Sequence, residues 1–381
     1  MPEFTADLAR ALPGPAWLVD RRAAATERAR ARSMPSADEE IWRYSRIAEL
    51  DLDTFTPAPV ATTVSGQIVP RPVSDEGEVG IVMADAPDVF AELNDAFSSP
   101  ILLKVRAGLI LDEPVVVTHT VHADGVAVFP RLVVEAGADS EITVIERFVS
   151  TDVHSLVVPV VELKAHPAAR IRYVGVNQLG PRVWSIGHQL ADGDRDSTTL
   201  LASVVLGGDY ARVRTDARLT GQGAHCDQIA VYFGEGSQMH DFRTLQHHVA
   251  PKTTSDLLFK GAVEGHAKSV YTGLIKIGKG ARGSTAFQTN RTLKLSEGAW
   301  AESVPNLDIE NNDVRCSHAS AVGPVDEEQR FYLESRGVPP AVAERLIVLG
   351  FFAEVLDRLP VAGLSAELRD AVAAKLDRRD A

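Results

Sequence analysis

Two side chains with metal-binding chemistry lie close together in the polar segment 308–318. Cys316 and His318 are separated by one residue, and alternate residues of a β-strand face the same side of a sheet. In a strand they would be roughly 6–7 Å apart, and thiolate and imidazole both suit iron, zinc or copper. Two ligands do not close a tetrahedral site, so we expect any metal here to be transient or shared with another chain. The alternative is that Cys316 packs as a small apolar residue and His318 is an ordinary surface residue.

A second polar cluster contains three histidines within nine residues, His240, His247 and His248. Histidine is a common metal ligand, but this spacing does not match a closed zinc motif. We therefore favour a structural role, as a polar ladder across stacked strands. Cys226 has only His225 as a basic neighbour in sequence that could lower its thiol pKa, so we predict a buried structural thiol.

The composition of the 381-residue chain excludes several classes of protein. It has 39 Lys and Arg against 52 Asp and Glu, and this formal net charge of −13 argues against binding to nucleic acid or to an anionic membrane. Two cysteines are too few for a disulfide framework or for a four-cysteine site made by this chain alone. Phosphate-loop, nucleophile-elbow, HExxH and dinucleotide motifs are missing. With no signal sequence and no apolar run of about 20 residues, we expect a cytoplasmic protein.

The middle of the chain has the pattern of many short strands. Segments rich in β-branched residues, such as 131–134, 141–145 and 171–174, are separated by Gly, Asp, Asn and Pro. Helical periodicity is almost absent here, which disfavours an α/β fold. Similar Gly-Ala corners recur at imperfect intervals of about 20–30 residues, which favours a solenoid over a β-sandwich or jelly roll. The sequence therefore predicts a mainly β protein with a parallel β-helix over residues 100–322.

Helices are predicted on both sides of this core, in an N-terminal domain (1–99) and a C-terminal domain (323–381). At the N-terminus we expect helices before Pro13 and at 17–31, a third beginning near Ser36, where a capping pattern occurs, and a short one at 86–97.

Three helices are predicted at the C-terminus. The first opens at Asp326 and stops at Gly337, the second covers 341–359 after two prolines, and the third starts near Ser365. The second is apolar on more than one side, so it must contact more than one neighbour. Either it plugs the open end of the solenoid and protects the edge strands, or it is a docking surface for a partner protein.

An ordered series of motifs resembles the SufB/SufD family of iron–sulfur cluster assembly proteins. The strong matches cover about residues 255–358, and weaker matches extend over most of the chain. The motifs are Trp42-Arg43-Tyr44-Ser45, Lys260-Gly261, residues 269–276, residues 288–293, residues 305–309, Asp313-Val314-Arg315-Cys316-Ser317-His318 and residues 322–337. Because the chain is short and poor in cysteine, and has the Asp-Val-Arg-Cys-Ser-His form of its motif, it looks like the SufD branch. The family usually continues this motif with Gly-Ala-Thr, whereas Ala319-Ser320-Ala321 follows here.

The resemblance implies a right-handed parallel β-helix between helical domains, in a complex with SufB and two copies of the ATPase SufC. It implies that His318, assisted by Cys316, lies at the SufB interface, where a transient iron–sulfur cluster or iron is shared and no cofactor is stably bound. The residues implied in docking of SufC, on the C-terminal helices, are Asp326, Glu327, Glu328, Phe331, Tyr332, Arg336, Phe351, Phe352 and Glu354.

On this interpretation the chain is a non-catalytic scaffold subunit whose energy comes from a separate ATPase. Two alternatives remain. One is a β-helix polysaccharide lyase or hydrolase, which would carry clustered acidic or basic residues in a groove. The other is a stand-alone structural protein in which the end of the β-helix pairs with a second copy, and we expect a homodimer when the chain is isolated.

Overall fold

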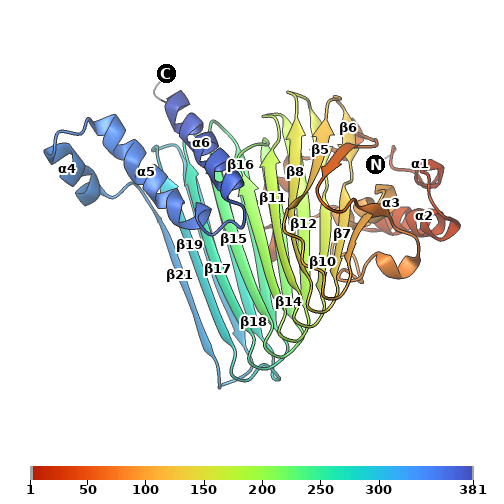
Figure 1. Ribbon diagram of the computed structural model, residues 1–381. Helices are drawn as coiled ribbons and strands as arrows, with labels where there is room; N and C mark the ends of the chain where they lie inside the picture. Colours follow the sequence, from red (N-terminus) through yellow and green to blue (C-terminus); the bar gives the residue numbers. More distant parts are fainter. Residues whose placement is uncertain (1–2, 380–381) are drawn as a thin grey trace.

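Two β-sheets wound into one coil form the centre of the protein in the computed structural model, which describes residues 3–379 (Figure 1). Sheet A contains β1 (Thr56–Pro57), β3 (Arg71–Pro72), β4 (Ile101–Val105), β6 (Val126–Val128), β7 (Arg131–Ala136), β9 (Ser155–Val157), β10 (Val160–Ala165), β12 (Val183–Gly193), β14 (Tyr210–Leu219), β16 (Met239–His248), β18 (Lys268–Ile277) and β20 (Trp300–Ile309). Sheet B contains β2 (Ala61–Ser65), β5 (Val115–Val121), β8 (Glu141–Ser150), β11 (Arg170–Gln178), β13 (Thr198–Val205), β15 (His225–Gly234), β17 (Thr254–Val263), β19 (Thr285–Lys294) and β21 (Arg315–Gly323).

The chain alternates between the two sheets, so each strand pairs in parallel with the strand one turn later. One turn takes 26 residues from Trp184 to its partner Tyr210 and 32 residues from Lys268 to its partner Trp300. About eight turns stack in this way, which confirms the prediction of a parallel β-solenoid. β-branched and aromatic residues on the inner faces of both sheets fill the lumen, because a half-buried pleated surface favours them.

The two ends of the solenoid differ. At the first turn the short strands β2 and β3 run antiparallel to β5 and β4 and cover them. At the last turn, within residues 3–379, β20 pairs only with β18, and β21 pairs only with β19. The last rung therefore has an open edge in both sheets.

The N-terminal segment packs on the outer face of sheet A. Its helical elements are α1 (Ala6–Ala11), α2 (Ala16–Ala31), α3 (Val89–Phe97) and four 3₁₀ turns, η1 (Glu40–Trp42), η2 (Ile47–Glu49), η3 (Leu52–Thr54) and η4 (Glu76–Glu78). Side chains of this segment, including Trp42 and Phe90, form one core with Trp184 and Tyr210 of the sheet. The predicted helices before Pro13, at 17–31 and at 86–97 are confirmed.

The helix predicted from Ser36 is wrong. Ser36 and Glu39 do form part of the capping pattern, since Glu39 Oε1 accepts from the Ser36 backbone N–H at 3.0 Å. The chain then crosses sheet A in short 3₁₀ turns, with the Trp42 ring under the Arg212 guanidinium at 3.8 Å. Tyr44 has φ of 64°, which a helix does not allow, and its ring lies against Trp300 of the last rung. Packing on the sheet has overridden the local helical pattern.

The C-terminal helices α4 (Glu327–Ser335), α5 (Pro340–Leu356) and α6 (Ala362–Arg379) were predicted correctly. Asp326 caps α4 by accepting from the Glu328 and Gln329 N–H groups, and Gly337, with φ of 85°, ends it. None of the helices in residues 3–379 is long and apolar enough to cross a bilayer.

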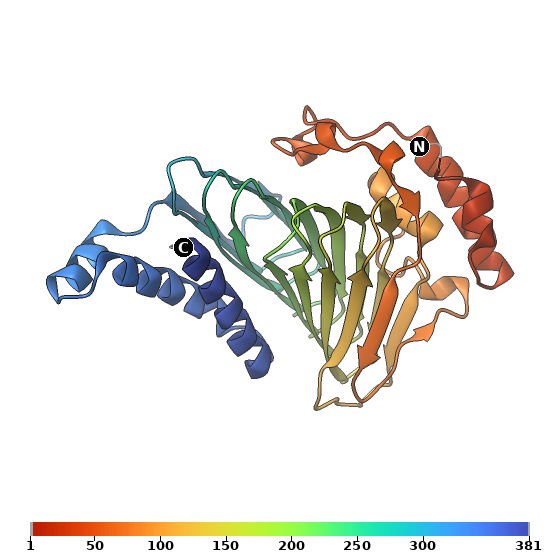
Figure 2. The ribbon, with the colours of Figure 1, turned by 90° about the horizontal axis from the view of Figure 1, so that it is seen from above.

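The proposed plug at the end of the solenoid is wrong, because α5 and α6 lie on the outer face of sheet B. Val348 and Phe352 of α5 and Leu368 of α6 pack on outward-facing residues of β11, β13, β15 and β17. The helix pair and the N-terminal helices thus lie on opposite faces of the coil (Figure 2). The apolar second helix buries Val348, Phe352 and Val355 against sheet B and α6, while its Val342 and Leu346 stay exposed.

Candidate cluster-ligand site on the last rung

Cys316 and His318 lie on β21, the last strand of sheet B, and face the lumen. Their register partners on β19 are Ala286 and Gln288, both of which are buried inside the coil. Because stacked residues of parallel strands face the same way, the two candidate ligands point into the same lumen. No rung lies above them, so His318 is exposed and Cys316 is partly covered. The structure therefore brings the pair together at the open end, as the spacing predicted.

The Cys316 side chain packs against the apolar floor of the lumen formed by Ile275, Ile277, Ala281 and Ala286. This burial raises the pKa of its thiol, so the neutral thiol predominates at pH 7. The thiolate, which is the nucleophile and the metal ligand, becomes available when the pH rises or when a metal replaces the proton.

Cys226 occupies the same lumen column three strands deeper. The register runs from Cys226 through Ser255 and Ala286 to Cys316. Its side chain is 1% exposed, and burial raises the pKa of its thiol to about 12. Cys226 is thus a buried thiol, as its sequence context indicated.

The two thiols should differ in reactivity in the native protein. We expect iodoacetamide at pH 8.5 to modify Cys316 and to leave Cys226 intact, with a rate that falls about tenfold per pH unit on the acidic side of the Cys316 pKa. Peptide mass spectrometry would read the modified site. The Cys316→Ser protein should stay unlabelled until denaturant is added, and labelling of native Cys226 would contradict this assignment.

The three histidines of β16 do not converge. His248 faces the lumen, where its ring nitrogens lie 2.7 Å from Thr253 Oγ1 and 2.8 Å from Ser255 Oγ. His240 is buried with its ring edge-on to Tyr232, and His247 faces outward. Across residues 3–379 no group of three or more His, Cys, Asp or Glu side chains is placed to hold a metal. His248 instead forms part of a polar hydrogen-bonded column.

The buried His248 should make the protein less stable in acid. Burial lowers the pKa of His248 to about 4, whereas an unfolded histidine protonates near pH 6.5. Protons therefore favour the unfolded chain as the pH falls below 6.5, and this contribution to stability is lost progressively down to about pH 4. We expect His248→Gln to remove about 2 kcal/mol of the stability difference between pH 7 and pH 5, measured by urea unfolding. Equal pH dependence of the wild type and His248→Gln would refute the expectation.

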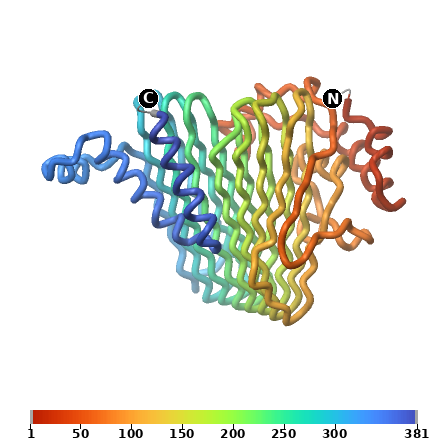
Figure 3. The backbone as a smooth tube through the Cα atoms, turned by 45° about the horizontal axis from the view of Figure 1, so that its top comes forward, coloured from red at the N-terminus to blue at the C-terminus, as the bar shows by residue number. Residues whose placement is uncertain are grey.

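The C-terminal helices carry a groove and an exposed aromatic pair. A groove of about 650 Å³ lies between the ends of β19 and β21 and helices α4 and α5. Phe331 and Tyr332 on α4 are 72% and 59% exposed, while α4 itself projects past the last strands (Figure 3). The charged residues Asp326, Glu327, Glu328 and Arg336 are exposed alongside.

The other three candidate docking residues lie where α5 meets the sheet. Phe352 is fully buried against Phe233, and Phe351 is partly buried. Glu354 pairs with Lys260 of β17, whose ammonium also donates to the Phe351 carbonyl oxygen at 2.9 Å. These contacts position α5. Phe352 and Phe351 are thereby covered, whereas Glu354 stays exposed on α5, like the candidates on and next to α4.

Lys260, part of the Lys260-Gly261 motif, is a positioning residue for α5. Its side chain is 4% exposed on the outer face of sheet B, with its charge over the Phe351 ring. The available signal was a single lysine in the apolar strand 257–263, because an unpaired lysine is almost never buried.

Comparison with known proteins assigns the family. A family model described as SUF system FeS cluster assembly, SufBD core domain, matches residues 119–351. The chain is 31% identical over 364 residues to an iron–sulfur cluster assembly SufBD family protein of Mycobacterium tuberculosis, with 90% of each chain covered. It is 30% identical over 277 residues to the iron–sulfur cluster assembly protein SufD of Bacillus subtilis, with 72% of this chain and 63% of the relative covered. The chain therefore belongs to the SufBD family and has a role in SUF iron–sulfur cluster assembly.

Proposed function

We propose that this chain is a non-catalytic scaffold subunit of a SufBCD complex, and that it contributes Cys316 and His318 to a nascent cluster. The observation that carries the proposal is the position of this pair on the lumen side of the last rung, which has no neighbouring rung on its outer side. A second solenoid of similar cross-section, such as SufB, would continue both sheets from the open edge and complete the ligand set. The cluster is cargo, held only while the two subunits are joined.

The ATPase SufC would dock on the C-terminal helices. Exposed aromatic residues are typical anchors of protein interfaces, and Phe331 and Tyr332 project from α4 beside a groove. Lys260 ties α5 to β17, which is two strands from β21 in sheet B. Nucleotide-driven movement of the docked helices would therefore act on the sheet that carries His318, and would open and close the shared site.

The three parts of the chain would have separate tasks in a cytoplasmic complex. Residues 1–99 would brace the outer face of sheet A, residues 100–322 would form the scaffold, and residues 323–381 would receive the ATPase. In the absence of SufB, the open edge would pair with a second copy of this chain, because the same strands are available on both. The isolated protein would then be a homodimer.

Co-expression with SufB and SufC tests the proposal. We expect a complex of one chain, one SufB and two SufC, whose mass is measured by light scattering. His318→Ala should leave this stoichiometry unchanged and reduce cluster formation in the reconstituted complex at least tenfold, an effect of the size seen when a metal-site group is lost. His122→Ala, which alters an exposed histidine far from β21, is the matched control. Normal cluster formation by an intact His318→Ala complex would reject the role of this residue.

A further inference from the structure

A layer of buried amides lies directly beneath His318 in the lumen. Gln288 and Asn290 of β19 pair in register with His318 and Ser320 of β21. Neighbouring strands are about 4.8 Å apart, so Gln288 is the register neighbour of His318 on the strand beneath it. Gln288 is 2% exposed and Asn290 is 1% exposed.

The Gln288 amide is held by the opposite sheet. Its Nε2 donates to the hydroxyl oxygen of Tyr271 on β18, and that hydroxyl also lies 3.1 Å from Thr244 Oγ1. The contact needs a glycine at position 273, because a Cβ there would lie 2.1 Å from Gln288 Nε2 and 2.2 Å from the Tyr271 oxygen. In the structure the amide nitrogen of Gln288 therefore faces Tyr271, and Gly273 leaves the space for this contact.

This arrangement leaves the carbonyl oxygen of Gln288 without a partner. Its Oε1 is buried and accepts no hydrogen bond from any of the described residues. Buried acceptors are nearly always satisfied in folded proteins. The adjacent donor in the column is the imidazole of His318, which carries one N–H when neutral.

We propose, on the basis of the proposed function, that Gln288 is a positioning residue for His318. The exposed His318 ring makes no hydrogen bond to Gln288 Oε1 in the structure, and we infer that it turns toward the lumen so that Oε1 accepts the imidazole N–H. This bond fixes one tautomer and one ring orientation. The other ring nitrogen then directs its lone pair out of the open end, toward a metal shared with the partner. Histidine ligands commonly donate their second nitrogen to an acceptor of this kind. Two motifs without an assigned task, at 269–276 and 288–293, thus meet beneath the ligand.

The tautomer of His318 is measurable in the full-length protein without any cluster. Selective ¹⁵N-histidine labelling gives separate nitrogen shifts for the protonated and bare ring nitrogens, and His318→Ala identifies the resonance. In the wild type we expect one dominant tautomer. Gln288→Leu should give averaged shifts, and Gln288→Glu, which keeps an acceptor oxygen, should restore the dominant form. Tyr271→Phe should give an intermediate spectrum, because it frees the amide without changing β19.

Gln228→Leu is the matched control. Gln228 lies in the same lumen column, three strands below His318, and its buried side-chain oxygen also has no partner. The variant therefore measures the effect of losing a buried amide that is not next to His318. Its spectrum for His318 should equal that of the wild type. Titration with Zn²⁺ alone should show about tenfold weaker binding in Gln288→Leu than in Gln228→Leu.

An unchanged tautomer and unchanged Zn²⁺ binding in folded Gln288→Leu would overturn the proposal. This outcome is distinct from failure of the proposed function. If His318→Ala left cluster assembly intact while Gln288→Leu altered the tautomer, the contact of Gln288 with His318 would be supported. The role of His318 in cluster assembly would be rejected.

Discussion

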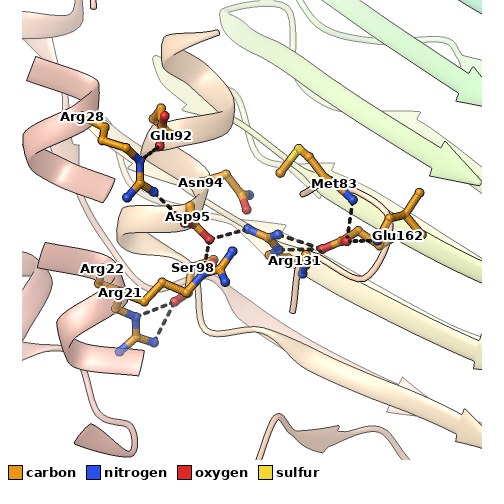
Figure 4. Close-up of polar contacts among 12 residues, drawn as sticks. Arg21, Arg22, Arg28, Met83, Glu92, Asn94, Asp95, Ser98, Arg131 and Glu162 are labelled. Atoms are coloured by element: carbon orange, nitrogen blue, oxygen red, sulfur yellow. Dashed lines mark hydrogen bonds and ion pairs between the residues drawn. The ribbon is translucent and has the colours of Figure 1, made fainter. Parts of the chain in front are cut away.

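Replacing Arg131 with methionine is expected to lower the free energy of unfolding by about 3–5 kcal/mol, because it leaves the buried Glu162 carboxylate without its cation. The Arg131 side chain is 0% exposed and donates to Glu162 Oε1 at 2.7 Å and Asp95 Oδ1 at 2.9 Å (Figure 4). Glu162 is also fully buried. Burial raises its pKa, but the charge of Arg131 and the N–H groups of Val82 and Met83 outweigh this, and the pKa of Glu162 is lowered overall.

This cluster joins strands β7 and β10 of sheet A to the 80–83 loop and to helices α2 and α3. Glu162 on β10 accepts from the backbone of the 80–83 loop, and Asp95 on α3 also pairs with Arg21 of α2. Urea unfolding of Arg131→Met would measure the loss. The double variant Arg131→Met with Glu162→Gln should recover part of it, because no buried charge is then left on β10. A loss below about 1 kcal/mol would contradict the expectation.

Phe352→Ala is expected to destabilise the protein by about 3–5 kcal/mol, since it empties a fully buried ring position between α5 and sheet B. The effect should be local at first. Hydrogen exchange should rise in α5, in α6 and on the outer face of sheet B, while the rungs remain protected.

Phe331→Ala is the matched comparison on the same helical region. The Phe331 ring is 72% exposed, so stability should change by no more than about 0.5 kcal/mol. Binding of SufC should nevertheless weaken, because the variant removes an exposed aromatic anchor. If Phe331→Ala bound SufC as the wild type does, the docking surface would have to be sought elsewhere.

The sequence was informative where local chemistry and burial agree. β-branched segments with turn residues gave the strands, and Asp326 and Gly337 marked the two ends of α4 correctly. The same-face position of Cys316 and His318 also followed from the two-residue period of a strand.

The sequence did not predict the local structure where contacts with elements far away in the chain determine it. The capping pattern at Ser36 is present, but the chain after it packs on sheet A through the contact of Trp42 with Arg212 and does not form a helix. The apolar α5 could cover an end or a face, and only the outward residues of β15 and β17 settle which. The partnership of Gln288 with Tyr271 spans two sheets, so no spacing along the chain predicts it.

The unlike ends of the coil limit how copies of it can assemble. The first turn ends in the short antiparallel strands β2 and β3, whereas the last turn ends in the long strands β20 and β21. On the proposed function, one last turn would pair with another last turn, and this junction would leave no long strand edge to bind a third body.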